Sequence, residues 1–122
     1  MAYLPAALVA AGIAIASLWE NPQMPEAVAL TDKTWHLIMY AVLGLALMAA
    51  FVANNHSRIY HYVLVWVFMT AYGAMMEVLQ HFCTLTRSGE IADLYADALG
   101  ALIGVALVGI WYAVRKKQNT EN

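Results

Sequence analysis

The chain has 122 residues, of which 63% are hydrophobic and only 11% are charged, and its mean hydropathy is +0.64. A soluble domain carries about a quarter charged residues, so this composition excludes an ordinary water-soluble domain and favours a membrane protein. The net charge of −2 argues against a nucleic-acid partner, and the single cysteine, Cys83, excludes an internal disulfide.

Four apolar segments follow one another, at about residues 4–19, 33–52, 60–82 and 91–114. Each of the last three has roughly the 20 residues that a helix needs to cross about 30 Å of hydrocarbon. The first is shorter, and its small residues around Ala14 to Ser17 are typical of a signal peptide. Because no basic segment precedes it and Pro5 interrupts its start, we interpret it as a retained helix. The sequence predicts a single all-α domain over residues 1–122, a polytopic membrane protein with four transmembrane helices in a compact bundle.

Helix-breaking and polar residues separate these segments. Pro22 and Pro25 end the first helix, and Thr31-Asp32 is expected to cap the N-terminus of the second. The other two connections are the polar stretches 54–58 and 84–89. With four crossings, both termini and the turn 54–58 therefore share one side of the membrane.

The basic residues predict the orientation. The side of the termini carries Arg58, Arg115, Lys116 and Lys117, whereas the other side carries Lys33 and Arg87. Under the positive-inside rule this bias places both termini, including the basic tail 115–122, in the cytoplasm.

Ionisable residues gather at the opposite, outer ends of the last three predicted helices. Asp32, His36 and Tyr40 are four residues apart, so they form one stripe on the second helix, beside Lys33. The third helix carries Glu77, Gln80 and His81 in its last turns. The fourth helix begins with Glu90, Asp93 and Asp97, and the same face continues with Gly100 and Gly104.

Charged side chains inside an apolar span are costly unless they are paired or wetted, so such residues indicate a functional site. We expect the face of Asp93, Asp97 and Gly100 to pack against the other two clusters and form one outward-facing pocket, which Arg87 closes from above. Val105 is expected on the opposite face. A purely structural interpretation also exists, because polar residues can serve as helix caps and glycines allow close helix packing.

Three ordered motifs resemble the VanZ-like family of small bacterial membrane proteins, named after a teicoplanin resistance protein. They are Asp32-Lys33-x-x-His36-x-x-x-Tyr40, Tyr72-Gly73-x-x-x-Glu77-x-x-Gln80 and Arg87-Ser88-Gly89-Glu90-x-x-Asp93-x-x-x-Asp97-x-x-Gly100-x-x-x-Gly104. The resemblance implies a location in the bacterial plasma (inner) membrane and a role at the cell envelope, and it suggests antibiotic resistance. Where the family usually has asparagine, this chain has Asp97, which adds a potential negative charge.

Two functional interpretations follow, and a third treats the polar network as structural or as a proton relay. In the first, the pocket binds an envelope lipid head group or a lipoglycopeptide. Its ligand-binding candidates are Asp32, Lys33, Tyr40, Gln80, Arg87, Glu90 and Asp97. Lys33 and Arg87 would contact anionic groups.

In the second interpretation, the protein is an intramembrane hydrolase or transferase that acts on a lipid-linked envelope precursor. The catalytic candidates are His36, Glu77 and Asp93, with His36 or Glu77 as general base. A divalent cation is a candidate cofactor, with Glu77, Asp93, Asp97 and His36 as its possible ligands. No strong metal or nucleophile signature is present in the sequence, so the residues leave open whether the protein is an enzyme. The expected partners are membrane lipids and this envelope ligand, and the oligomeric state is not predicted.

Overall fold

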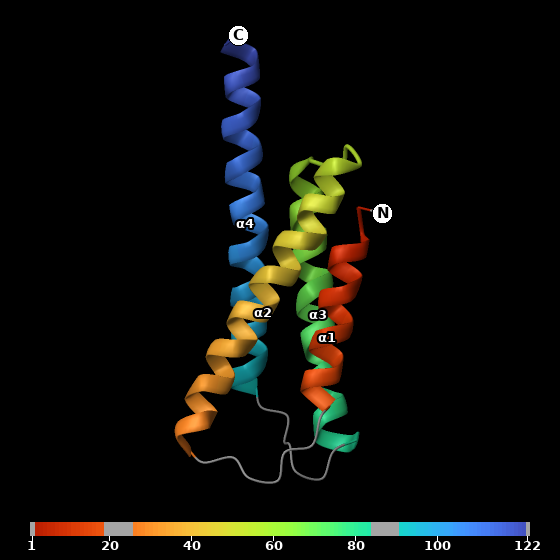
Figure 1. The fold of residues 1–122 in the computed structure, drawn as a ribbon, viewed down its shortest axis with the longest axis vertical. Helices are drawn as coiled ribbons and strands as arrows, with labels where there is room; N and C mark the ends of the chain where they lie inside the picture. Colours follow the sequence, from red (N-terminus) through yellow and green to blue (C-terminus); the bar gives the residue numbers. More distant parts are fainter. Residues whose placement is uncertain (1, 19–25, 84–90, 122) are drawn as a thin grey trace.

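A computed structural model describes residues 2–18, 26–83 and 91–121. They form four α-helices: α1 (Leu4–Leu18), α2 (Glu26–Ala53), α3 (Ile59–Cys83) and α4 (Ile91–Glu121). The described residues contain no strand, which confirms the predicted all-α architecture of four helices. Figure 1 shows that both termini lie at the same end of the bundle as the α2–α3 turn.

Three helices contain segments that are long and apolar enough to cross a membrane: Lys33–Ala53, Ile59–Phe82 and Ile91–Asn119. The shorter α1 has 15 residues and spans about 22 Å at 1.5 Å per residue, less than the roughly 30 Å of a hydrocarbon core. It packs against α2 and α3. A fourth crossing through α1 therefore stays a prediction.

Two helices are longer than expected. α2 begins at Glu26 and not near Lys33, so Thr31 and Asp32 lie inside the helix and the expected N-cap there is wrong. The physical reason is that the preceding segment, Glu-Ala-Val-Ala-Leu, is rich in strong helix formers and follows directly on a proline. α4 continues through the basic tail to Glu121, because this tail contains no glycine or proline to end it.

The α2–α3 turn shows why α2 ends where it does. Asn55 has a φ of 66°, the left-handed conformation that often follows a helix and that asparagine tolerates. His56 N–H donates to the Phe51 carbonyl oxygen at 2.8 Å, and Asn54 Nδ2 donates to the Ala50 carbonyl oxygen at 2.8 Å. These bonds satisfy carbonyl groups that the helix end would otherwise leave open.

The strongest packing in the bundle is between α2 and α4, followed by α3 against α4. Glycines permit the α2–α4 approach. A Cβ on Gly100 would collide with the Leu37 carbonyl oxygen, and a Cβ on Gly104 would collide with the Ala41 carbonyl oxygen. The backbones of α2 and α4 therefore touch directly, as small residues allow in membrane helix pairs.

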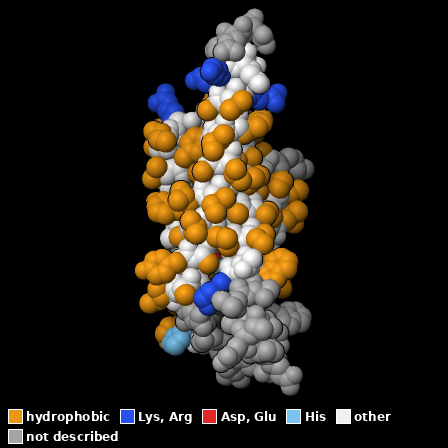
Figure 2. Space-filling view, turned by 90° about the vertical axis from the view of Figure 1, so that its left-hand side faces the viewer, with side chains coloured by type: hydrophobic (Ala, Val, Ile, Leu, Met, Phe, Trp, Pro, Cys, Tyr) orange, Lys and Arg blue, Asp and Glu red, His pale blue; other side chains and the backbone are white. Residues whose placement is uncertain are grey.

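The outer surface of the helices is largely apolar. Figure 2 shows hydrophobic side chains over the middle of the molecule and basic side chains above and below this band. Exposed side chains include Leu45, Phe68 and Leu107. The buried core contains Leu43, Met48 and other residues of all four helices. A surface of this kind is suited to contact with lipid and not with water.

Candidate functional site

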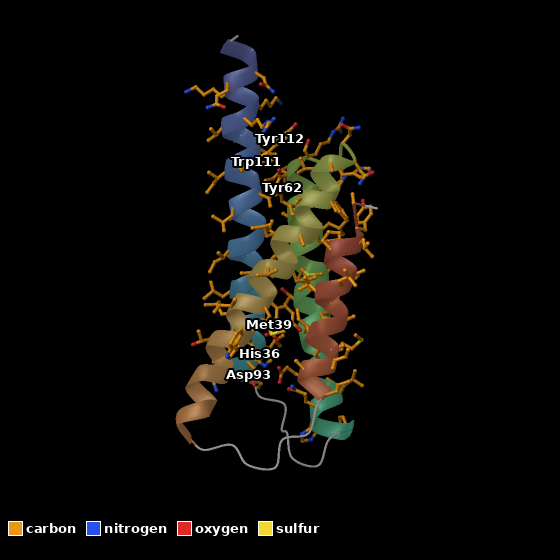
Figure 3. The ribbon with its side chains drawn as sticks, in the orientation of Figure 1. His36, Met39, Tyr62, Asp93, Trp111 and Tyr112 are labelled. Atoms are coloured by element: carbon orange, nitrogen blue, oxygen red, sulfur yellow. The ribbon has the colours of Figure 1, made fainter. Side chains whose placement is uncertain are left out.

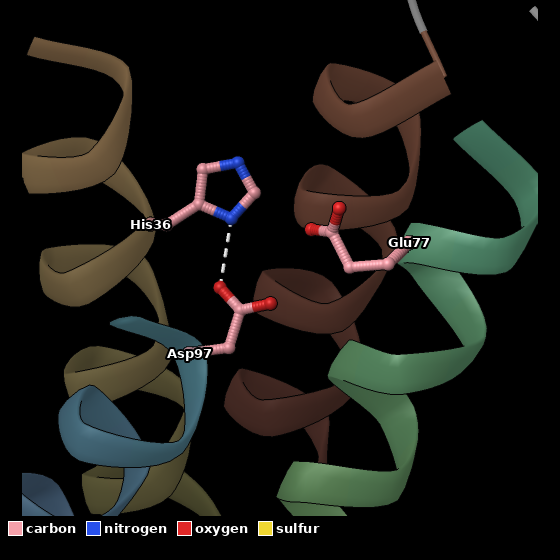
Figure 4. Close-up of side chains that lie close together, drawn as sticks. All are labelled: His36, Glu77 and Asp97. Carbon is pink, nitrogen blue, oxygen red and sulfur yellow. Dashed lines mark hydrogen bonds and ion pairs between the residues drawn. The ribbon is translucent and has the colours of Figure 1, made fainter. Parts of the chain in front are cut away.

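Three ionisable side chains from three helices meet inside the bundle. His36 of α2, Glu77 of α3 and Asp97 of α4 are all buried, and one potential ligand atom from each lies within 4.8 Å of the other two. Figure 4 shows the Glu77 carboxylate facing the His36–Asp97 pair. The sequence placed these residues on separate helices that should converge, and the structure brings them together.

His36 and Asp97 form a short hydrogen bond. His36 Nδ1–H donates to Asp97 Oδ1 at 2.7 Å, a length typical of charge-assisted bonds. Both side chains are buried, and Asp97 is 0% exposed. Because a carboxylate accepts from one specific ring nitrogen, this bond sets the orientation of the imidazole.

Gly73 of α3 makes room for Asp97. A Cβ on Gly73 would lie 2.9 Å from Asp97 Oδ2 and 3.0 Å from Asp97 Cβ, so any side chain there would push the carboxylate away. Glu77 is four residues further along the same helix, and therefore on the same face. The spacing of Gly73 and Glu77 thus lets one face of α3 both accommodate Asp97 and add a second carboxylate.

A second charged pair lies beside this cluster. Lys33 Nζ is 3.6 Å from Asp93 Oδ1, and the Lys33 side chain is 36% exposed whereas that of Asp93 is 7% exposed. Figure 3 shows Asp93 and His36 close to one end of the bundle, far from Trp111 and Tyr112 at the other end. Lys33 therefore places a positive charge beside the carboxylates at this end of the bundle.

Tyr40 lies one turn below His36 on α2 and is 1% exposed. Its ring is parallel to the His36 imidazole at a centroid distance of 6.4 Å and tilted against Tyr72 at 6.2 Å. Among the residues that the structure describes, none forms a hydrogen bond with Tyr40 Oη. Tyr72 Oη donates to the Ala10 carbonyl oxygen at 2.6 Å, which ties α1 to the site.

A groove on the side of the described bundle reaches one residue of the cluster. A groove of about 300 Å³ between α3 and α4 is lined by Glu77, His81, Phe82 and Leu94, among others. His36 and Asp97 are not among its lining residues. Glu77 is therefore the one residue of the cluster that lines this groove.

The remaining candidates divide into two groups. Gln80 is 2% exposed and lies one turn from Glu77 on α3. Asp32 belongs to α2, but its side chain is outside the described part of the structure, as are Arg87 and Glu90. The expectation that Arg87 closes the pocket therefore concerns residues that are not described.

Two features of the helix packing differ from the expectations from the sequence. A Cβ on Gly44 would lie 2.8 Å from the Ala101 carbonyl oxygen, so Gly44 belongs to the α2–α4 contact. Its position four residues after Tyr40 on the polar stripe could have revealed this. Val105 is 4% exposed and belongs to the core, so its predicted place on an opposite face is wrong. The buried face of α4 is wider than expected because α2 and α3 both pack on it.

This arrangement can do three things chemically. A buried His–Asp pair can take up and release protons, carboxylates can bind an amine or hydroxyl group, and the mixed nitrogen and oxygen donors can hold a cation. All three depend on side chains from different helices, so the site exists only in the folded bundle.

Comparison with known proteins agrees with this picture. The family model described as VanZ/LLP1 matches residues 6–112, which includes all the candidate residues named above. No curated protein and no solved structure matches the chain. Together with the three membrane-spanning lengths of apolar helix, the match shows that this chain is a membrane protein and belongs to the VanZ/LLP1 family.

Proposed function

We propose that this protein binds the polar head group of an envelope lipid, or of a lipid-anchored compound such as a lipoglycopeptide, at the outer face of the bacterial plasma membrane. The observation that carries the proposal is the burial of His36, Glu77 and Asp97 together inside apolar helices. Polar groups in such a place are costly and by default indicate function. The resemblance to the VanZ type adds a role in teicoplanin resistance to this proposal.

The lateral groove supports a lipid ligand. Glu77 shares the groove with Phe82, Ile91 and Leu94, so an acyl chain could lie along its apolar wall while its head group reaches the carboxylate. Lys33 at the edge of the cluster offers a contact for a phosphate. A ligand with both amine or hydroxyl groups and a phosphate would match these charges.

The test is lipid retention by the purified full-length chain. Native mass spectrometry in mild detergent should detect an envelope lipid or an added lipoglycopeptide bound to wild type, and Glu77→Gln should lower the bound fraction about tenfold. Glu121→Gln makes the same change near the other end of α4 and should retain the ligand fully. Equal retention by both variants would refute the proposed site.

The proposed orientation has its own test. In a Cys83→Ser background, a cysteine at Ser88 should react with a membrane-impermeant reagent added outside intact cells, and a reporter after Asn122 should be cytoplasmic. Labelling from outside at Asn55 instead would invert the orientation.

Catalysis is a second candidate, favoured by the 2.7 Å bond between His36 and Asp97 with Glu77 beside it. Such a pair can act as a general base on a lipid-linked precursor. Purified wild type would then convert an added lipid, and Glu77→Gln would abolish turnover while the fold and binding persist. Binding by wild type without any product would exclude this candidate.

A further inference from the structure

We propose that His36, Glu77 and Asp97 bind one divalent transition-metal cation of the Zn²⁺ class. This inference goes beyond head-group binding and does not depend on it. The three residues offer one imidazole nitrogen and two carboxylates, all buried and within 4.8 Å of one another. Zn²⁺ binds such nitrogen and oxygen donors at about 2.0–2.2 Å, so the donors would need to move together by about 1 Å.

Two of the three ligands are already held in place. The His36–Asp97 bond orients the imidazole and the carboxylate toward each other, and the backbone contact of α2 with Gly100 fixes the two helices. Glu77 has the longer, more adaptable side chain, and Figure 4 shows its carboxylate facing this pair. A cation would replace the proton that His36 and Asp97 share, and Glu77 would close the coordination.

Tyr40 gives an independent indication of a ligand. Its hydroxyl is buried and forms no hydrogen bond with any described residue, which is costly inside a membrane bundle. It lies one turn from His36 on α2, and the two rings are parallel at a centroid distance of 6.4 Å. Metal ligands are usually supported by a second layer of hydrogen-bond donors, and Tyr40 is placed to donate to a metal-bound carboxylate or water.

The donor types indicate which cations fit. Mg²⁺ and Ca²⁺ prefer oxygen ligands alone, whereas an imidazole nitrogen suits Zn²⁺ and related first-row ions. Asp93 was a candidate ligand, but it lies near Lys33 and is not in the three-residue group. Three protein ligands leave a fourth coordination position for water. Binding of a head-group phosphate oxygen at that position would be a further step, which depends on the proposed function.

The experiment is a Co²⁺ and Zn²⁺ titration of the full-length chain, purified in detergent with a histidine-free tag and stripped of metal. The readouts are metal content per chain and the visible absorption of bound Co²⁺. Wild type should bind one cation per chain, which excess Mg²⁺ does not displace. Glu77→Gln and Asp97→Asn should each weaken binding at least about tenfold, and Glu121→Gln should leave it unchanged.

Two controls keep the result decisive. Thermal unfolding of each variant in the same detergent identifies the variants that fold, and metal binding is compared only among these. His56 is exposed and His61 is half-buried, and the centroids of their rings lie 5.0 Å apart at the other end of the bundle, so this pair could bind metal adventitiously. Three outcomes would each overturn the proposal. The first is no metal binding by folded wild type, and the second is loss of binding in the double variant His56→Gln/His61→Gln. The third is full binding by folded Glu77→Gln and Asp97→Asn. Because no lipid is added, failure here leaves head-group binding untouched.

Discussion

The two ends of the α3–α4 interface contrast sharply. At one end Glu77 and Asp97 face each other with His36, all of them buried. At the other end the same two helices border an apolar groove of about 630 Å³, lined by residues such as Tyr62 and Leu102. One pair of helices thus presents buried charge at one end and an apolar hollow at the other.

Buried charges and apolar grooves differ in their energetic cost inside a membrane. An apolar groove costs little in a membrane, because acyl chains fill it as well as side chains do. Buried charges are expensive there and persist only with specific partners. The polar end therefore depends on a precise arrangement of helices, whereas the apolar end should tolerate change. The following substitutions test this comparison.

The largest effect should come from Gly100→Leu. A side chain there would meet the Leu37 backbone, so α2 and α4 must separate, and we expect a loss of about 3 kcal/mol or more in the free energy of unfolding. Detergent-induced unfolding followed by circular dichroism measures this loss. Gly12→Leu is the matched control, because nothing lies within 4 Å of a Cβ on Gly12. Equal stability of the two variants would contradict direct backbone packing.

Asp97→Ala should come next. It leaves His36 buried without its 2.7 Å acceptor, and breaking a buried charged pair from one side costs about 3 kcal/mol. The control is His81→Ala, at an exposed position near the same end, which should change stability by no more than about 0.5 kcal/mol. If His81→Ala were as damaging as Asp97→Ala, the buried pair would not be what distinguishes this end.

Val105→Ala should have an intermediate effect. Val105 is a core residue, so removing two methyl groups should cost about 1–2 kcal/mol. Leu107, two residues further, is 51% exposed, and Leu107→Ala should be nearly silent in unfolding measurements. The opposite ranking would restore the expectation that Val105 faces away from the bundle.

The smallest effect is expected at the apolar end. Ser57 Oγ donates to Tyr112 Oη at 3.1 Å, and hydrogen bonds of this kind in membrane proteins contribute about 0.6 kcal/mol. Ser57→Ala and Tyr112→Phe should each cost about that much, and the double variant no more than either alone. A cost comparable to that of Asp97→Ala would remove the contrast between the two ends.

Hydropathy and helical spacing were enough to predict the class of the protein and most of its helices. Three apolar runs of spanning length predicted α2, α3 and α4, because a chain in lipid must satisfy its backbone within each helix. The spacing of His36 and Tyr40, and of Asp97 and Gly100, predicted which face of each helix carries the site. These are local properties, set by helical periodicity alone.

Which of these faces meet, and how closely, depends on the packing of the whole bundle. It brought Glu77 to the His36–Asp97 pair, placed Asp93 beside Lys33 instead, and buried Val105. The sequence of a single helix predicts neither the width of the buried face on α4 nor the role of Gly44, because both depend on how neighbouring helices cross. The site forms where three helices pack together. Helical periodicity predicts which residues share a face of one helix, but it does not predict the distances between residues on different helices.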